Sequence, residues 1–241
     1  MYEHWFKRMI SYIARLVPTG MVLPIVRGPL KGMKWIAGSA AGEGKGLSVV
    51  ANKAEAGQLS EATKWLSKDS VCFDIGANVG LYTLLFSRFA RQVYAFEPLP
   101  RNIYFLYKTL AINNIDNAVI VTAAVAEHLQ QNRFLVSENC ALGMLSNKGG
   151  QPVLSVSVDE FCRFHGVIPD VVKIDVEGGE LDVLKGARGV LSANKPVIFL
   201  SVHSGELRRS CLSYLQELEY SDIVALNSER IDDATELLFR P

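Results

Sequence analysis

From residue 58 to the end of the chain, short apolar runs alternate with longer stretches that repeat apolar residues at helical spacing. In the first such pair, residues 70–75 suit a buried strand and residues 81–90 suit a helix. One face of that helix would carry Leu81, Leu84, Leu85 and Phe89. Strands separated by helices predict an α/β fold, with a mainly parallel sheet covered by helices on both faces.

The pattern predicts an ordered series of elements. Helices are expected at 58–66, 81–90, 98–114, 179–191 and 205–219. Strands are expected at 70–75, 92–97, 118–123, 170–175, 196–203, 221–226 and 236–240. About nine polar residues join the last two strands, which is too few for a crossover helix, so the final strand is expected to be antiparallel.

Two stretches that depart from this alternation set the predicted domain organisation. Residues 1–57 are expected to form an N-terminal extension, in which an amphipathic helix over 1–17 precedes Gly-rich loops or a small hairpin rather than core. Residues 58–241 are expected to form one domain with an insertion at 124–168. That insertion holds two β-like pieces, 132–137 and 152–158, and a short helix from Asp159.

The first 17 residues are not expected to act as a signal peptide or a membrane span. Lys7, Arg8 and Arg15 interrupt every apolar run within them, and the next apolar run, 21–26, is far too short to cross a bilayer. Two alternatives stay open for a basic amphipathic helix of this kind. It packs on its own domain or on a partner subunit, or it rests on a membrane surface.

Charge and cysteine content narrow the class of protein further. The chain carries 25 Lys and Arg against 25 Asp and Glu, so no overall field attracts nucleic acid. The four cysteines are far apart and form no CxxC pair: Cys72, Cys140, Cys162 and Cys211. This spacing predicts reduced, mostly buried thiols in a cytoplasmic protein, and it predicts neither a disulfide framework nor a zinc site.

The candidate chemistry follows from the strand ends. In an open α/β sheet, ligands bind beyond the carboxyl ends of the strands. Those ends carry Asp74, Glu97, Asp175 and His203, with Glu177 close by. The turn after the first strand, FDIGANVG, departs from the dinucleotide pattern GxGxxG, and several carboxylates disfavour a pyrophosphate. S-adenosylmethionine, which has a sulfonium, an ammonium group and ribose hydroxyls but no phosphate, fits these residues.

The motifs now allow a family resemblance to be stated. The chain resembles the FkbM family of S-adenosylmethionine-dependent methyltransferases from about Val71 to His203. The matching segments are FDIGANVGLYT, YAFEPLPRN, VSVDEFCRFHGVIPDVVKIDVEGGELDVLKGA and KPVIFLSVH. The resemblance implies a Rossmann-like seven-stranded methyltransferase sheet, so residues 58–241 would be a class I methyltransferase domain.

The resemblance also implies roles for individual residues. The methionine part of the cofactor would be held by Asp74, Gly76, Asn78 and Gly80. Glu97 would bind the ribose, Ala124 would border the adenine, and Asp175 would lie close to the transferred methyl. The chain departs from the family at Ser201, where a glutamate is common, and a contact to the substrate or to the lysine-bearing strand is in doubt there.

Three residues are the candidate catalytic groups: Asp175, His203 and Glu177. Asp175 is expected to orient an acceptor hydroxyl, and His203 has the ordinary pKa best suited to take its proton. Simpler roles stay open, because Lys173 and Asp175 alternate on one strand face and could form an internal ion pair. Glu180 is expected only to favour a helix start. These acids and His203 could gather a divalent cation, but their spacing does not require one, and no metal is expected.

The resemblance implies O-methylation of a hydroxyl on a sugar, glycolipid or polyketide-like small molecule. The acceptor is therefore expected to be a small molecule, a saccharide or a lipid-linked saccharide, and not nucleic acid. Two rival functions stay open: a non-catalytic module that binds S-adenosylmethionine and assists a partner, and an NAD-type oxidoreductase. The sequence does not identify the oligomeric state.

Overall fold

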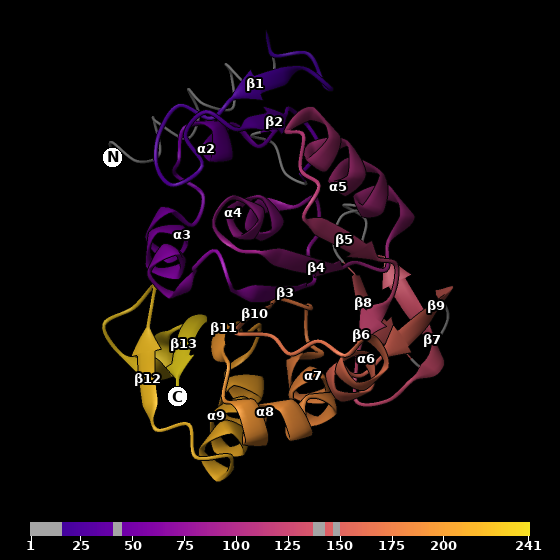
Figure 1. Ribbon diagram of the computed structural model, residues 1–241, viewed down its shortest axis with the longest axis vertical. Helices are drawn as coiled ribbons and strands as arrows, with labels where there is room; N and C mark the ends of the chain where they lie inside the picture. Colours follow the sequence, from indigo (N-terminus) through magenta and orange to yellow (C-terminus); the bar gives the residue numbers. More distant parts are fainter. Residues whose placement is uncertain (1–15, 41–44, 137–142, 147–149) are drawn as a thin grey trace.

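A seven-stranded sheet forms the centre of the computed structural model, which describes residues 16–40, 45–136, 143–146 and 150–241 (Figure 1). Its strand order is β12-β13-β11-β10-β3-β4-β5. The strands are β3 (Val71–Ile75), β4 (Gln92–Phe96), β5 (Ala118–Val121), β10 (Val171–Ile174), β11 (Val197–Ser201), β12 (Asp222–Ala225) and β13 (Glu236–Arg240). β13 runs antiparallel to both of its neighbours, β11 and β12, and the other neighbouring strands of this sheet are parallel to each other. The predicted α/β sheet with an antiparallel final strand is confirmed.

Helices cover both faces of this sheet, as the sequence pattern predicts. One face carries α3 (Ala56–Ala62), α4 (Leu81–Phe89) and α5 (Pro100–Ile112), and the other carries α6 (Val158–His165), α7 (Glu180–Gly186), α8 (Arg188–Asn194) and α9 (Gly205–Glu217) (Figure 1). Side chains of β3 alternate between the faces. Cys72 packs in a cluster with Leu84 of α4, whereas Phe73 packs in a cluster with Leu184 of α7.

The helix expected at 179–191 is two helices, α7 and α8, separated at Ala187. The cause is a side chain from α6. The carboxylate of Asp159 accepts hydrogen bonds from the backbone N–H groups of Gly189 at 2.7 Å and Val190 at 2.9 Å. A side chain that satisfies these otherwise unpaired donors allows a new helix to start at this point.

A smaller, four-stranded sheet with the order β6-β9-β7-β8 lies beside the main sheet (Figure 1). It contains β6 (Ala124–Val125), β7 (Gln130–Val136), β8 (Gly143–Ser146) and β9 (Gln151–Val156). β7 and β9 are close to the two β-like pieces that the sequence predicts, and β8 was not predicted. Since β6 begins three residues after β5 ends, this sheet stands directly beside the carboxyl end of β5.

The segment before α3 contains the expected hairpin, β1 (Val22–Pro24) with β2 (Lys34–Ile36), and a short helix, α2 (Leu47–Val50). The expectation that this segment lies outside the core is wrong. Ile25, Leu30 and Trp35 are each 1–2% exposed and share a cluster with α4. Irregularly spaced apolar residues give no periodic signal, although they bury as completely as periodic ones.

Some expectations for the N-terminal extension stay predictions. The helix over 1–17 lies almost wholly outside the described residues, and α3 crosses the predicted boundary at residue 57. None of the helices in the described ranges is long and apolar enough to cross a membrane. Cys72, Cys162 and Cys211 are free and buried, as predicted, whereas Cys140 lies outside the described residues.

Replacing Leu30 by Ala is expected to destabilise the whole domain if the N-terminal segment belongs to the core. Loss of a buried leucine side chain costs about 2–5 kcal/mol through lost burial and a residual cavity. Urea unfolding measures this loss. Leu154→Ala is the matched control, because Leu154 is 53% exposed and its truncation should change stability by less than about 0.5 kcal/mol. Equal losses of stability in the two variants would contradict the assignment of the N-terminal segment to the core.

Candidate functional site

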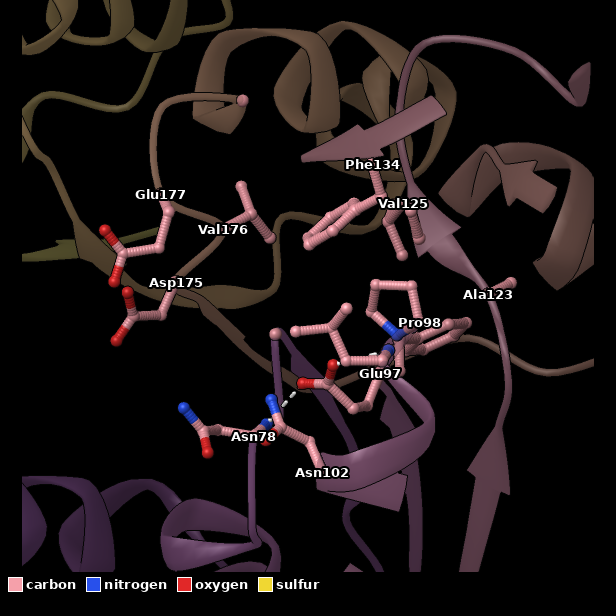
Figure 2. Close-up of a pocket in the computed structure, with 15 residues that line it drawn as sticks. Asn78, Glu97, Pro98, Asn102, Ala123, Val125, Phe134, Asp175, Val176 and Glu177 are labelled. Atoms are coloured by element: carbon pink, nitrogen blue, oxygen red, sulfur yellow. Dashed lines mark hydrogen bonds between the residues drawn. The ribbon is translucent and has the colours of Figure 1, made fainter. Parts of the chain in front are cut away.

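A cavity of about 200 Å³ opens at the carboxyl ends of β3, β4 and β10. Asp175 and Glu177 stand on one side of it, Val125 and Phe134 on the other, and Glu97 lies between them (Figure 2). Its lining consists of Gly76, Asn78, Phe96, Glu97, Pro98, Leu99, Asn102, Ala123, Ala124, Val125, Phe134, Asp175, Val176, Glu177 and Gly179. The cavity is therefore apolar at one end and acidic at the other.

The turn from β3 to α4 forms the floor of this cavity and is held by the neighbouring strands. The backbone N–H groups of Gly76 and Ala77 donate to the carbonyl of Phe96 on β4. Gly76 has a φ of 83°, and a Cβ at this position would lie 1.9 Å from the carbonyl oxygen of Asp175. Only glycine permits this close approach of two backbone segments.

Glu97 is a buried carboxylate that the turn itself positions. It is 4% exposed and accepts hydrogen bonds from the backbone N–H groups of Asn78 at 2.8 Å and Leu99 at 2.9 Å (Figure 2). Burial raises its pKa to about 7, although those two hydrogen bonds and a third from the Asn102 side chain act in the opposite direction. A carboxylate has about four acceptor positions, so Glu97 can still accept a further hydrogen bond from a hydroxyl group.

Two of the residues expected to bind cofactor lie away from this cavity. Asp74 lines an adjoining cavity and accepts a 2.5 Å hydrogen bond from the Thr83 hydroxyl, and burial raises its pKa to about 6. Gly80 lines neither of these two cavities. A Cβ on Gly80 would lie 2.7 Å from Leu106, so this glycine allows α4 to pack against α5. The other predicted residues, among them Ala124, do line the first cavity.

The three predicted catalytic residues lie close together: Asp175 and Glu177 line the cavity, and His203, which lines neither cavity, contacts both of them. His203 Nε2 lies 3.5 Å from an Asp175 oxygen and 3.3 Å from a Glu177 oxygen. His203 Nδ1 lies 2.5 Å from Glu180 Oε1. Glu180 is fully buried, so the expectation that it only favours a helix start is wrong. A buried carboxylate on Nδ1 fixes the orientation of the imidazole ring and directs Nε2 toward Asp175.

The same contacts decide the protonation of His203. The hydrogen bond to Glu180 is the largest influence and raises the pKa of His203 to about 9, with further support from Glu177 and Asp175 and some opposition from partial burial. Nε2 therefore carries a proton at neutral pH and becomes a proton acceptor only as the pH approaches 9.

A buried lysine lies beneath Asp175. The Lys173 ammonium is 3.6 Å from Asp175 and 3.4 Å from Glu236, and it also donates to the Ser201 hydroxyl. The internal ion pair between Lys173 and Asp175, which the sequence left open, is present. Ser201, which replaces the family's common glutamate, lies directly across from Glu236 on β13 and donates to it at 2.9 Å. Glu236 thus supplies to Lys173 the negative charge that position 201 lacks.

The arrangement offers three donor atoms to a metal ion. Each of three residues, Asp175, Glu177 and His203, offers one ligand atom, and these three atoms lie within 4.8 Å of one another. A cation would have to displace the proton on His203 Nε2, which the raised pKa of that residue opposes. Metal independence stays a prediction.

Sequence reasoning missed several residues of the site. Phe134 falls within a predicted strand, but nothing in its surroundings showed that it would face the cavity. Glu236 and Glu55, which lines the adjoining cavity, are single acidic residues outside the strand-end motifs. Glu180 lies within the KIDVEGGE segment, but the sequence assigned it only a role at the helix start. Asn102 is 1% exposed, and its place at the end of the YAFEPLPRN segment was the available signal.

The sheet order, the antiparallel final strand and a ligand cavity at the carboxyl strand ends define a Rossmann-like fold of the methyltransferase type. The crystal structure of methyltransferase FkbM from Methylobacillus flagellatus KT shares this fold, with a TM-score of 0.56 and 20% sequence identity, over 72% of this chain and 44% of that chain. The family model for the methyltransferase FkbM domain matches residues 74–222. The chain belongs to the FkbM methyltransferase family.

Two curated relatives are similar in sequence. Hexuronic acid methyltransferase AglP from Haloferax volcanii is 32% identical over 170 residues, which are 67% of this chain and 68% of the relative. Methyltransferase 1 from Beauveria bassiana is 26% identical over 145 residues, which are 49% of this chain and 58% of the relative. The chain therefore spans less than two thirds of the B. bassiana protein and of the crystallised M. flagellatus chain.

Replacing Glu180 by Gln is expected to lower the pKa of His203 from about 9 toward the ordinary value of 6.5. The substitution keeps the shape of the side chain but removes the charge that stabilises the imidazolium. An NMR titration of the His203 ring protons, assigned with a His203→Ala spectrum, measures the change. Glu206→Gln, an exposed residue at the start of α9, is the control. If the pKa of His203 falls by less than one unit in Glu180→Gln, the charge of Glu180 is not the main cause of the raised value.

Proposed function

We propose that the protein transfers the methyl group of S-adenosylmethionine to a hydroxyl oxygen of a saccharide. Family membership supports methyl transfer. The relative from H. volcanii, a hexuronic acid methyltransferase, supports a saccharide as the acceptor. The observation that carries the proposal is a single cavity with buried Glu97 in its centre and Asp175, backed by His203, at its acidic end (Figure 2).

The chemistry of the cavity lining fits this cofactor. The remaining acceptor capacity of Glu97 suits a ribose hydroxyl, and Ala124, Val125 and Phe134 suit the faces of an adenine ring. Asp175 and Glu177 at the other end suit a positively charged sulfur. When bound, S-adenosylmethionine supplies an electrophilic methyl group on a good leaving group.

The remaining task of the protein is to align an acceptor oxygen with the methyl carbon and to remove the proton of that oxygen. In the proposed mechanism, the Asp175 carboxylate accepts a hydrogen bond from the acceptor hydroxyl and orients it. His203 Nε2, 3.5 Å from Asp175, takes the proton when the imidazole is neutral. Glu180 holds the ring in place through Nδ1 and stabilises the imidazolium that forms.

A hexuronic acid offers two kinds of oxygen to such a site. Its hydroxyl groups need a base, whereas its carboxylate does not. Asp175, Glu177, Glu180 and the His203 imidazolium form one cluster beside the cavity, and their charges sum to about −2 when the three acids are ionised. This local charge disfavours a carboxylate at the reacting position and favours a neutral hydroxyl.

Binding and product analysis together test the proposed function. In calorimetry, wild-type protein is expected to bind S-adenosylmethionine and S-adenosylhomocysteine but not NAD, and Glu97→Ala is expected to weaken binding about 10-fold or more, because hydrogen bonds to a charged group are lost. Incubation with saccharides that contain hexuronic acid is then expected to give an alkali-stable methyl ether.

Other results would identify the rival functions. Preferential binding of NAD would point to an oxidoreductase. Binding of the cofactor without transfer to any saccharide, glycolipid or polyketide-like acceptor would point to a non-catalytic module. An alkali-labile product would place the methyl group on the carboxylate and contradict hydroxyl methylation.

The proton-transfer step has its own signature in the pH dependence of turnover. Because His203 must be neutral to act as a base, kcat is expected to rise with pH and to level off near pH 9. His203→Ala is expected to remove this rise and to lower kcat about 10²–10⁴-fold, whereas Asp175→Asn is expected to lower kcat and keep the rise. A chelator should leave the wild-type rate unchanged. Near-normal turnover in both variants, with cofactor still bound, would contradict the proposed roles of His203 and Asp175 in proton transfer.

A further inference from the structure

Lys173 is a buried cation that the proposed mechanism does not use, although it contacts the carboxylate that orients the acceptor. Its ammonium lies 3.6 Å from Oδ2 of Asp175, while Oδ1 of the same carboxylate lies 3.5 Å from His203 Nε2. Lys173 is 1% exposed, so solvent weakens its attraction for Asp175 much less than it would at the surface. The orientation of the Asp175 carboxylate therefore depends on how the charge of Lys173 is balanced.

Strand register brings a balancing charge from the C-terminal strand. Lys173 on β10 pairs with Phe199 on β11, and Ser201, two residues further along β11, lies on the same face of the sheet. Glu236 on β13 pairs with Ser201 and shares this face. The Ser201 hydroxyl accepts from Lys173 Nζ and donates to Glu236 Oε2 at 2.9 Å, and Lys173 Nζ lies 3.4 Å from that oxygen. The three polar groups thus contact one another in pairs.

The charges of this cluster indicate what Glu236 does for Asp175. Burial by itself would lower the pKa of Lys173, but the charges of Asp175 and Glu236 outweigh it, so the ammonium stays charged. The charges of Lys173 and Glu236 cancel, which leaves the negative charge of Asp175 available to a ligand. A buried cation that lost Glu236 would draw the remaining carboxylate inward. The Asp175 side chain, which is 36% exposed, has room to turn in this way.

We propose that Glu236 is a positioning residue for methyl transfer: it neutralises Lys173 and thereby keeps the Asp175 carboxylate turned toward His203 and the acceptor. This inference rests on the proposed function, because it takes Asp175 to orient the acceptor hydroxyl. It gives the antiparallel strand β13 a part in catalysis, although Glu236 lines neither of the two cavities. What the site needs is a negative charge beside Lys173, and the strand that carries this charge is exchangeable.

Moving the carboxylate from one strand to the other tests this exchange. Residues directly opposite each other in an antiparallel pair have Cβ atoms about 4.5–5.5 Å apart, so a glutamate side chain placed at Ser201 can reach the ammonium that Glu236 contacts. Glu236→Gln removes the charge but keeps the shape of the side chain. Ser201→Glu combined with Glu236→Gln returns one carboxylate to the cluster, now from β11.

Kinetics provide the first measurement. Glu236→Gln is expected to lower kcat about 10–100-fold, because a small misplacement of an orienting group has effects of this size. Its affinity for S-adenosylhomocysteine in calorimetry should stay within about twofold of the wild-type value. The combined variant is expected to recover kcat to within about threefold of wild type. Glu229→Gln, an exposed residue in the connection between β12 and β13, is the matched control and should change neither quantity.

Crystal structures of the same variants give a second measurement, which does not depend on turnover. In Glu236→Gln, the distance from Asp175 Oδ1 to His203 Nε2 is expected to exceed about 4 Å, the limit of an ion pair. In the combined variant, this distance is expected to return to the wild-type value. A merely structural role for Glu236 would not make the position of Asp175 follow the charge from one strand to the other.

The outcomes separate the possible roles of Glu236. Wild-type kcat in Glu236→Gln, or an Asp175 carboxylate that has not turned, would overturn the proposal. Loss of cofactor affinity together with kcat, without recovery in the combined variant, would mean a structural role and overturn it as well. If Glu236→Gln does not fold, the combined variant decides, because it is expected to fold and to transfer methyl groups, and failure of either kind contradicts the proposal. A wild-type protein that methylates no acceptor would refute the proposed function itself, and the crystal structures would still decide whether Glu236 positions Asp175.

Discussion

The buried ammonium of Lys173 is the charge around which the centre of this molecule is arranged. A lysine side chain that is 1% exposed is tolerated only when carboxylates surround it, and here they come from four separate segments: Asp175 after β10, Glu236 on β13, Asp74 on β3 and Glu55 from the N-terminal segment. Burial by itself would lower the pKa of Lys173, but these charges outweigh it and raise the pKa. Because these carboxylates must surround the Lys173 ammonium, β13 and the N-terminal segment are held next to the floor of the site.

Above this floor, carboxylates of similar chemistry take different tasks because their surroundings differ. Glu97 is buried, and two backbone N–H groups hold it in place, so it can recognise hydroxyl groups in a fixed geometry. Asp175 is about one-third exposed and stands beside His203, where an acceptor can reach it. Glu180 is wholly buried behind the imidazole and acts on the site only through that ring. Position relative to solvent, more than residue type, separates the proposed tasks of binding, orientation and support.

Much of the fold could be predicted from the sequence, because the signals concerned are local. Apolar runs and helical periodicity give the strands and helices of the main sheet, and the short polar connection before Glu236 gives the antiparallel final strand. What escaped prediction depends on contacts between distant segments. The break between α7 and α8 follows from Asp159 on another helix, and the burial of Trp35 follows from packing against α4. Neither feature has a periodic signature.

In the candidate site, too, some features could be predicted from local sequence and others depend on contacts between distant segments. The sequence by itself determined the glycine turn, the acidic residues at the strand ends and the family, since parallel strands bring their carboxyl ends together whatever the detailed packing. Tertiary structure alone decided which carboxylates become partners of one another. It placed Glu236 opposite Ser201, Glu180 behind His203 and Glu55 in the lining of the adjoining cavity that also contains Asp74. These pairings depend on strand register and on long-range burial, and a linear pattern of residues does not encode either one locally.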